Sequence, residues 1–228
     1  MDSNNLKGIA FMAGFNPNPD TMKREIANLS IATEMDVLEI NFNKYLEAGY
    51  SYIEILRRVK EDLKEAKLKG YRYVVAYSLG APIYTLNADE EETTMDKVVF
   101  TSPAFTPVNP LQMLKDHRNP DIKKSRATPK TVNAAGLGYI LKVASHANFK
   151  LANLVGTPTL TLQGDVDPSV RSRGIKLVHN RLLRLEDDPE VQHSLCQFPN
   201  GRHHLLSETE TDVQALKLVN AFFKGVKF

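Results

Sequence analysis

Residues 73–81 read YVVAYSLGA, an apolar run that leads directly into a serine followed by small residues. The tyrosines and β-branched valines favour a buried strand over residues 73–77, and the residues after Ser78 favour the start of a helix. A serine at such a corner belongs to neither element, so its hydroxyl is expected to point outward. The stretch therefore predicts a strand that turns abruptly into a helix around Ser78.

This corner matches the G-x-S-x-G pattern of a nucleophile elbow, in which small flanking residues let a strand and a helix pass close to a strained serine. Ala76 takes the first glycine position and Gly80 takes the second. Alanine is the smallest substitute, so the space at the turn is largely kept. The motif alone does not separate a nucleophile from an ordinary loop serine, and other segments must decide between them.

Composition and charge describe a compact protein with one principal domain. The chain has 228 residues, of which 42% are hydrophobic and 25% are charged, which predicts one domain with a modest insertion. The net charge of +2 gives no overall field that would attract nucleic acid or an acidic membrane. The single cysteine, Cys196, excludes an internal disulfide and favours a reducing compartment. No secretory leader and no run of about 20 apolar residues is found, so we expect a cytoplasmic protein without a membrane span.

Strand-like and helix-like patterns alternate along most of the chain. This alternation is typical of an open parallel sheet with helices on both faces, an α/β architecture. A capping box of Ser51 and Glu54 predicts the start of one helix, and Ser207 with Glu210 predicts the start of the last. The predicted strands cover residues 8–12, 36–42, 73–77, 97–102, 157–163 and 191–198.

The alternation breaks down between residues 103 and 154, where prolines and basic residues accumulate. A long irregular excursion inside a compact domain is usually a lid or a binding insertion. The basic clusters at 115–118 and 123–126 lack interleaved aromatic residues, so we interpret them as solvated surface and not as a polyanion site. The prediction is a single domain over residues 1–228 with a small cap at 103–154.

Two loops supply partners for an activated serine. Residues 164–168 follow one predicted strand and carry Asp165 and Asp167, whereas residues 199–206 follow the next and carry His203 and His204. Reactive groups gather at the carboxyl ends of the strands in open α/β sheets. A nucleophilic serine needs a base, and the base needs an acid that orients it. Chain position alone leaves both the aspartate and the histidine open.

In this order, the segments 76–80, 158–167 and 201–208 resemble the α/β-hydrolase family, and within it the lysophospholipase, monoacylglycerol lipase and carboxylesterase-like branch. The resemblance covers nearly the whole chain. It implies a three-layer fold and a serine hydrolase that cleaves carboxylic esters through an acyl-enzyme, with acyl-glycerols and thioesters among the candidate substrates. The family spacing favours Asp167 over Asp165 as the catalytic acid and His203 over His204 as the base.

The resemblance also implies an oxyanion hole made of two backbone N–H groups. Leu79, at the start of the elbow helix, supplies the first, and Phe15, in the loop after the first strand, supplies the second. Related enzymes typically carry His-Gly in that loop, whereas this chain has Ala13 and Gly14. In the family the loop normally follows the third strand. Because it follows the first strand here, we predict a reduced sheet of about six parallel strands that lacks the two leading antiparallel ones.

Apolar residues of the presumed cap are expected to line the substrate pocket, although they could equally be buried to hold the cap down. The partner implied is a small acyl ester, and the chemistry needs no cofactor. A metal site is not predicted, because adjacent histidines differ from the i, i+4 pair of helical zinc sites. No oligomeric state is predicted. The pocket candidates are Phe105, Leu111, Met113, Leu137 and Tyr139.

Two other functions fit parts of the pattern. A noncatalytic protein of the same fold, which binds a ligand or partner, is favoured by Ala76 and Ala13 in place of the usual glycine and histidine. A peptidase of the same fold would need acidic cap residues to bind a free amine, and the cap has only Asp116 and Asp121 against many basic residues. Since the chain keeps a serine, an aspartate and a histidine in the family order, we favour the hydrolase.

Overall fold

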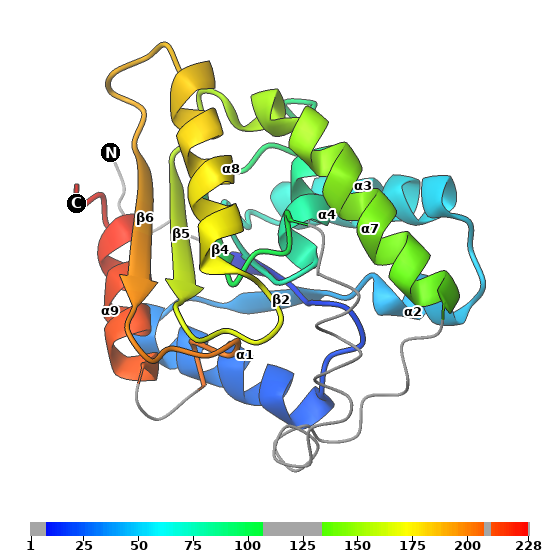
Figure 1. Cartoon of the computed structure of the whole chain (residues 1–228), viewed down its shortest axis with the longest axis horizontal. Helices are drawn as coiled ribbons and strands as arrows, with labels where there is room; N and C mark the ends of the chain where they lie inside the picture. The colour runs from blue at the N-terminus through cyan, green and yellow to red at the C-terminus, as the bar shows by residue number, and fades with distance from the viewer. Residues whose placement is uncertain (1–7, 107–133, 208–210, 228) are drawn as a thin grey trace.

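The computed structural model describes residues 8–106, 134–207 and 211–227. Within these ranges six strands form one sheet in the order β2-β1-β3-β4-β5-β6, and every neighbouring pair is parallel (Figure 1). The predicted six-stranded parallel sheet is thus confirmed. The strands are β1 (Ile9–Met12), β2 (Val37–Ile40), β3 (Tyr73–Tyr77), β4 (Lys97–Thr101), β5 (Thr159–Gly164) and β6 (His193–Phe198).

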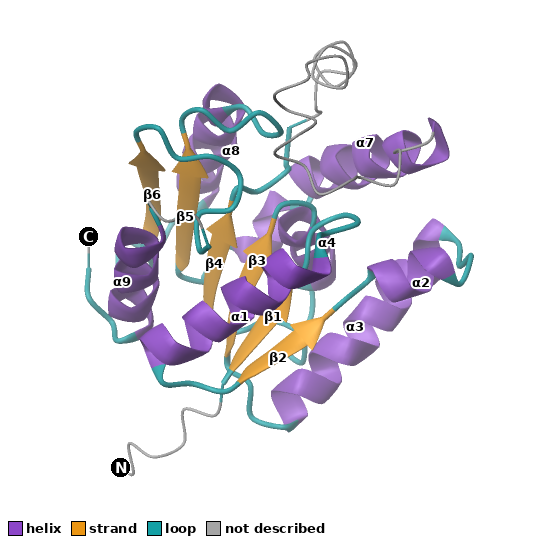
Figure 2. Ribbon diagram, turned by 90° about the horizontal axis from the view of Figure 1, so that it is seen from below, coloured by secondary structure: helices purple, strands orange, loops and turns teal. Residues whose placement is uncertain are grey.

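Helices cover both faces of this sheet and make a three-layer structure (Figure 2). One face carries α1 (Pro19–Thr33) and α9 (Asp212–Phe223). The other face carries α3 (Tyr52–Leu68), α4 (Gly80–Asn87), α7 (Ala134–Phe149) and α8 (Ser172–Leu185), and a short helix, α2 (Asn43–Glu47), follows β2. None of the helices in the described ranges is long and apolar enough to cross a membrane.

Alternation along β3 explains how the sheet separates two cores. Val74 and Ala76 pack with the core under α3 and α4, whereas Val75 and Tyr77 pack with the core under α1 and α9. Successive side chains of a strand point to opposite faces, and here both faces are covered. This is why the strand is a continuous apolar run in the sequence. It also means that Tyr77, the last strand residue, faces α1, and that the chain leaves the sheet at the next residue.

Two helices begin at local capping residues, and a third does not begin at the cap that the sequence predicted. The Asn18 side chain accepts the N–H of Asp20 at the start of α1, and the capping box of Ser51 and Glu54 is present at the start of α3, as predicted. The predicted cap at Ser207 is wrong, because α9 begins five residues later. The hydroxyl of Ser207 instead donates to Glu25 on α1, so a tertiary contact outcompetes the local one.

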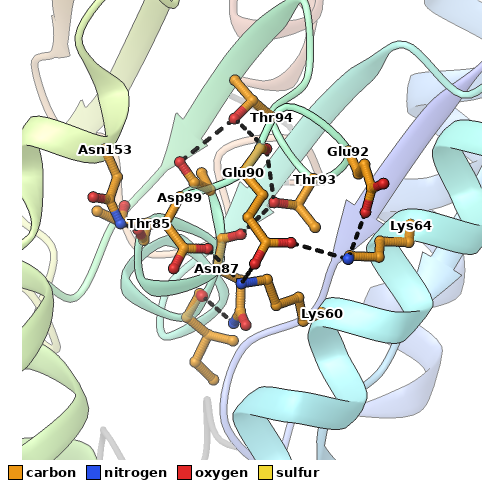
Figure 3. A network of polar contacts seen from close by, with 12 residues as sticks. Lys60, Lys64, Thr85, Asn87, Asp89, Glu90, Glu92, Thr93, Thr94 and Asn153 are labelled. Carbon is orange, nitrogen blue, oxygen red and sulfur yellow. Dashed lines mark hydrogen bonds and ion pairs between the residues drawn. The ribbon is translucent and has the colours of Figure 1, made fainter.

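The acidic run 89–92 is exposed and forms an ion-pair network with α3 (Figure 3). Lys60 Nζ lies 2.7 Å from carboxylate oxygens of both Asp89 and Glu90, and Lys64 Nζ lies 2.9 Å from Glu90 and 2.5 Å from Glu92. Exposed pairs contribute about 0–1 kcal/mol each. Their role here is to join α3 to the end of α4, remote from the serine corner.

The segment predicted as a cap is only partly described. Residues 134–149 form α7, which packs beside α4 in the helical layer, and residues 151–154 form a short 3₁₀ turn (Figure 2). Residues 107–133, with the basic clusters, lie outside the described residues. The division into a domain over 1–228 and a cap at 103–154 therefore stays a prediction.

A buried histidine on β6 gives the fold a pH dependence. The side chain of His193 is fully buried, with Nδ1 2.9 Å from Thr159 Oγ1 and Nε2 3.1 Å from Glu186 Oε2. Burial lowers the pKa of His193, and the opposing effect of Glu186 is smaller. The unfolded chain then takes up a proton near the ordinary value of 6.5, whereas the folded chain does so only at lower pH. Stability is complete above that value and is lost as the pH falls towards the folded pKa.

We expect His193→Gln to weaken the decline of stability between about pH 7 and pH 5, because it removes the group that protonates preferentially in the unfolded state. The free energy of unfolding should be measured by urea titration at several pH values. The native protein should lose stability across this range faster than the variant. Equal pH slopes for the two proteins would contradict the assignment.

Candidate active site

Ser78 sits in a strained backbone conformation between β3 and α4. Its φ angle is 51°, in the left-handed region, where a residue other than glycine costs roughly 1–3 kcal/mol. The N–H of Ser78 donates to Thr101 O, and its carbonyl accepts the N–H of Ala104, both at 3.0 Å. These two bonds to β4 and the loop after it hold the corner in place, so the predicted sharp turn is present.

The two positions that flank the serine in the elbow motif explain how the turn packs. A Cβ atom added at Gly80 would lie 2.5 Å from Met12 O and 2.7 Å from Ala13 O, so only glycine allows α4 to begin this close to the end of β1. Ala76 is fully buried in regular strand geometry. Alanine is accommodated there without strain, and its presence leaves the corner intact.

The structure brings Ser78, His203 and Asp167 into one hydrogen-bonded chain. His203 Nε2 lies 3.2 Å from Ser78 Oγ, and His203 Nδ1 lies 2.7 Å from Asp167 Oδ2. Three elements supply them: the β3–α4 corner, the loop after β5 and the loop after β6. Since a carboxylate only accepts hydrogen bonds, Nδ1 carries the proton and Nε2 is left to accept the serine hydroxyl.

Asp167 is held as a carboxylate. Its side chain is fully buried, and burial by itself would raise its pKa, but His203 and the backbone N–H groups of Val170 and Ser169 outweigh burial and hold the pKa below its ordinary value. Asp167 Oδ1 lies 2.7 Å from Ser169 N and 3.0 Å from Val170 N. These bonds also fix the carboxylate plane, so Oδ2 stays directed at the imidazole.

The rival candidates have other partners. His204 Nδ1 lies 3.1 Å from Glu25 Oε1, and His204 Nε2 lies 3.2 Å from the hydroxyl of Tyr77. Asp165 accepts hydrogen bonds from Ser172 and Gln197 on the protein surface. Of the two adjacent histidines, His204 therefore contacts Tyr77 and His203 contacts Ser78.

Glu25 is a site residue that the sequence analysis missed. It is fully buried on α1, where Oε1 contacts His204 and accepts from Ser207, and Oε2 has no hydrogen-bond partner among the described residues. Its position between Met22 and Leu29, on the buried face of α1, was the available signal. A carboxylate on an apolar helix face needs a buried partner, and a loop histidine supplies it.

The predicted oxyanion donors are backbone N–H groups without an acceptor in the described part of the chain. This holds for both Leu79 and Phe15. Leu79 directly precedes α4, where the unpaired N–H groups of a helix start create a positive potential. The loop of Phe15 lies against the elbow, because a Cβ atom added at Gly14 would come 3.0 Å from Ser78 Cβ.

The pocket candidates are divided. Phe105 is buried in the core, edge-on to Phe100 with ring centroids 5.5 Å apart. Tyr139 is partly buried on α7 and packs edge-on to Tyr52 at 5.8 Å. Leu137 belongs to α7, but its side chain is not among those described, and Leu111 and Met113 lie outside the described residues. Among the described residues, no group of three or more His, Cys, Asp or Glu side chains could hold a metal ion.

Solved structures with a similar fold are known. A metagenome-derived lipolytic enzyme is 13% identical, with 96% of this chain and 94% of that chain covered at a TM-score of 0.69. For a monoacylglycerol lipase from Paleococcus ferrophilus the identity is 14%, the coverage 94% and 93%, and the TM-score 0.63. A thermostable carboxyl esterase from Bacillus coagulans is 13% identical, with 98% of this chain and 91% of that chain covered at a TM-score of 0.66. The chain has the α/β-hydrolase fold.

The structural similarity shows the fold alone, so the activity has to be argued from the site. No protein-family model and no curated protein matches the sequence. In this chain the elbow, the loop with Asp167 and the loop with His203 all lie at the carboxyl ends of their strands, β3, β5 and β6. The same edge of the sheet carries the loop after β1, so every predicted catalytic group is located there.

Gly80→Ala tests the close packing on which the elbow depends. We expect the free energy of unfolding to fall by about 1–3 kcal/mol, because the new methyl group would overlap the backbone carbonyls of Met12 and Ala13 at the end of β1. Gly138→Ala is the matched control, since a Cβ atom there, within α7, would meet nothing within 4 Å. That change should stabilise the helix by about 0.5–1 kcal/mol. Thermal unfolding of both variants measures the difference, and a Gly80→Ala protein as stable as the native one would contradict the packing argument.

Proposed function

We propose that this α/β-hydrolase is a serine hydrolase that cleaves carboxylic ester bonds. Ser78 is the nucleophile, His203 the general base and acid, and Asp167 the residue that orients His203. The observation that carries the proposal is the continuous chain from Asp167 through His203 to Ser78 Oγ, with distances of 2.7 and 3.2 Å, at a serine held in the left-handed conformation. The lipases and esterases among the structures of the same fold support ester cleavage as the reaction class.

The geometry fits a two-step acyl transfer. Ser78 Oγ attacks the ester carbonyl carbon while His203 Nε2 takes the hydroxyl proton. The tetrahedral intermediate then collapses, the alkoxide leaves with that proton from His203, and the acyl group remains on Ser78. In the second step His203 takes a proton from water as the water oxygen attacks the acyl carbon. The bond between that carbon and Ser78 Oγ then breaks, His203 returns the proton to Ser78 Oγ, and the carboxylic acid is released. Asp167 keeps Nδ1 protonated throughout and offsets the positive charge on the imidazolium.

The negative charge on the carbonyl oxygen needs donors that are already in place. The N–H groups of Leu79 and Phe15 are proposed for this role, since neither has an acceptor among the described residues and they belong to the elbow and to the β1 loop that packs against it. Leu79 adds the potential of the α4 N-terminus.

The substrate proposed is a small acyl ester, with acyl-glycerols and thioesters included in the class. Its acyl group would contact the segment between β4 and α7, for which Leu111, Met113, Leu137 and Tyr139 are the candidates, together with Phe105. The buried position of Phe105 against Phe100 supports a role beneath the pocket and not at its surface. The segment would act as a cap within a single domain.

Ser78→Ala is the direct test of this proposal. The native protein should hydrolyse p-nitrophenyl esters, and the variant should lose at least about 10³-fold in kcat while keeping its thermal stability. A series of acyl chain lengths from acetate upward measures the size of the pocket at the same time. A fluorophosphonate probe should label the native protein at Ser78 and leave the variant unlabelled. A folded native protein that neither hydrolyses nor reacts would favour a noncatalytic binding protein of the same fold.

The two histidines can be separated by their rates of fluorophosphonate labelling. We expect His203→Gln to slow labelling of Ser78 by about 10³-fold or more, because the base is removed. His204→Gln should slow it by no more than about tenfold, since His204 contacts Tyr77 and not the nucleophile. The two substitutions are chemically identical and adjacent, so each is the control for the other. The opposite order of rates would assign the base to His204.

A further inference from the structure

Asn43 is a buried residue that contacts the β1 loop from the side. It begins α2, directly after β2, and is only 8% exposed. Its Nδ2 donates to Gly14 O at 2.8 Å and to Asn41 Oδ1 at 2.9 Å, and its Oδ1 accepts the N–H of Asn16 at 2.8 Å. One amide side chain therefore holds the residues immediately before and after Phe15.

These two bonds fix the direction of the Phe15 N–H. No peptide bond in the described residues is cis, and in a trans peptide the carbonyl and the following N–H point in opposite directions. Because Gly14 O is directed at Asn43, the N–H of Phe15 points away from Asn43. Asn43 follows β2, on one side of β1, and Ser78 follows β3, on the other side. The N–H of Phe15, which has no acceptor among the described residues, therefore points away from the β2 side of the loop.

The loop needs such a constraint. Gly14 has access to more backbone conformations than any other residue type, and Asn16 adopts a left-handed φ of 43°. The N–H of Ala13 still donates to Ile40 O, at 3.4 Å, and beyond it Asn43 holds both the Gly14 carbonyl and the Asn16 N–H to the β2 side. Without the amide, the Gly14 carbonyl would lose its partner on the β2 side, and the orientation of the Gly14–Phe15 peptide would be less constrained.

We propose that Asn43 is a positioning residue of the oxyanion hole, which holds the Phe15 N–H towards the reacting carbonyl. This inference rests on the proposed esterase function and assigns the residue that organises one half of its charge stabilisation. Asn43 does not touch the substrate. It acts through the Gly14–Phe15 peptide, so its loss should reduce stabilisation of the tetrahedral intermediate and leave substrate binding largely unchanged.

The test compares Asn43→Asp and Asn43→Ala with the native enzyme. Asn43→Asp keeps the shape of the side chain and an acceptor for the Asn16 N–H, but it loses the donor to Gly14 O and places two oxygen atoms together. Asn153→Ala is the matched control, because Asn153 also donates through Nδ2 to a backbone carbonyl, that of Thr85, at 3.0 Å. Its bond lies between α4 and the turn at 151–154, away from the β1 loop.

We expect both Asn43 variants to lose about 10- to 100-fold in kcat on p-nitrophenyl esters, with KM within about threefold of the native value. The inhibition constant of an alkyl trifluoromethyl ketone, which forms a tetrahedral adduct with a serine hydroxyl, should rise by a similar factor, since the adduct oxygen occupies the oxyanion hole. Asn153→Ala should change the melting temperature and neither of these constants. The concentration of active enzyme in each sample is measured by titration with the fluorophosphonate, so that unfolded protein does not lower the apparent kcat.

The outcomes separate the two proposals. If Asn43→Asp, corrected for active enzyme, retains the native kcat and the native affinity for the ketone, Asn43 has only a structural role and the inference is overturned. If the native protein itself is not labelled at Ser78, the proposed function fails, and the role of Asn43 fails with it. Labelling of the native protein, followed by a parallel loss of kcat and ketone affinity in both Asn43 variants, supports the inference.

Discussion

The contact between the start of α4 and the end of β1 is the constraint on which the site depends. Gly80 lies so close to the carbonyls of Met12 and Ala13 that a Cβ atom would come within 2.7 Å of both. This contact places the N-terminus of α4, which follows Leu79, beside the loop after β1 that carries Phe15. Next to this contact, Ser78 adopts a left-handed φ of 51°. Strain of this kind persists only where the surrounding structure determines it from several directions, and here β1, β3 and β4 all take part.

The histidine loop is fixed in a comparable way from two sides. His203 extends towards Asp167 and Ser78, and His204 extends towards Glu25 and Tyr77. The two chains of contacts start from neighbouring residues of the loop and end at neighbouring residues of the elbow. Burying a carboxylate on α1 costs stability. The contacts of Glu25 are therefore better explained by the orientation that they give His204 and its loop than by a gain in stability. They prevent the loop from rotating about a single hydrogen bond, and the 3.2 Å contact between His203 Nε2 and the serine is held as a result.

Sequence patterns predicted the parts of this site that depend on order along the chain. The six strands, the corner at Ser78 and the capping box at Ser51 all follow from local composition and spacing, and the choice of His203 came from motif spacing. The position of Glu25 on an apolar helix face could have marked it as buried, but its partners, like those that Asn43 holds in the β1 loop, are distant in sequence and close only in the folded chain. The predicted cap at Ser207 failed for the same reason, since a partner on α1 takes its hydroxyl. The helix α2 was missed because its five residues, Asn43–Glu47, are too few to show a helical period.

The two departures from the elbow and loop motifs need not indicate a lapsed active site. Ala76 occupies regular, fully buried strand geometry, and the turn beyond it is kept by Gly80 and by the bonds of Ser78 to β4 and the following loop. Ala13 stands where the resemblance to the α/β-hydrolase family leads one to expect a histidine, yet the loop is held from the β2 side by Asn43, which bonds the carbonyl of Gly14 and the N–H of Asn16. A protein that only binds a ligand would gain nothing from a left-handed serine aligned with a buried carboxylate through an imidazole. Retaining that strain, together with a separate tether for the neighbouring loop, is best explained by a need to hold the reacting atoms in place.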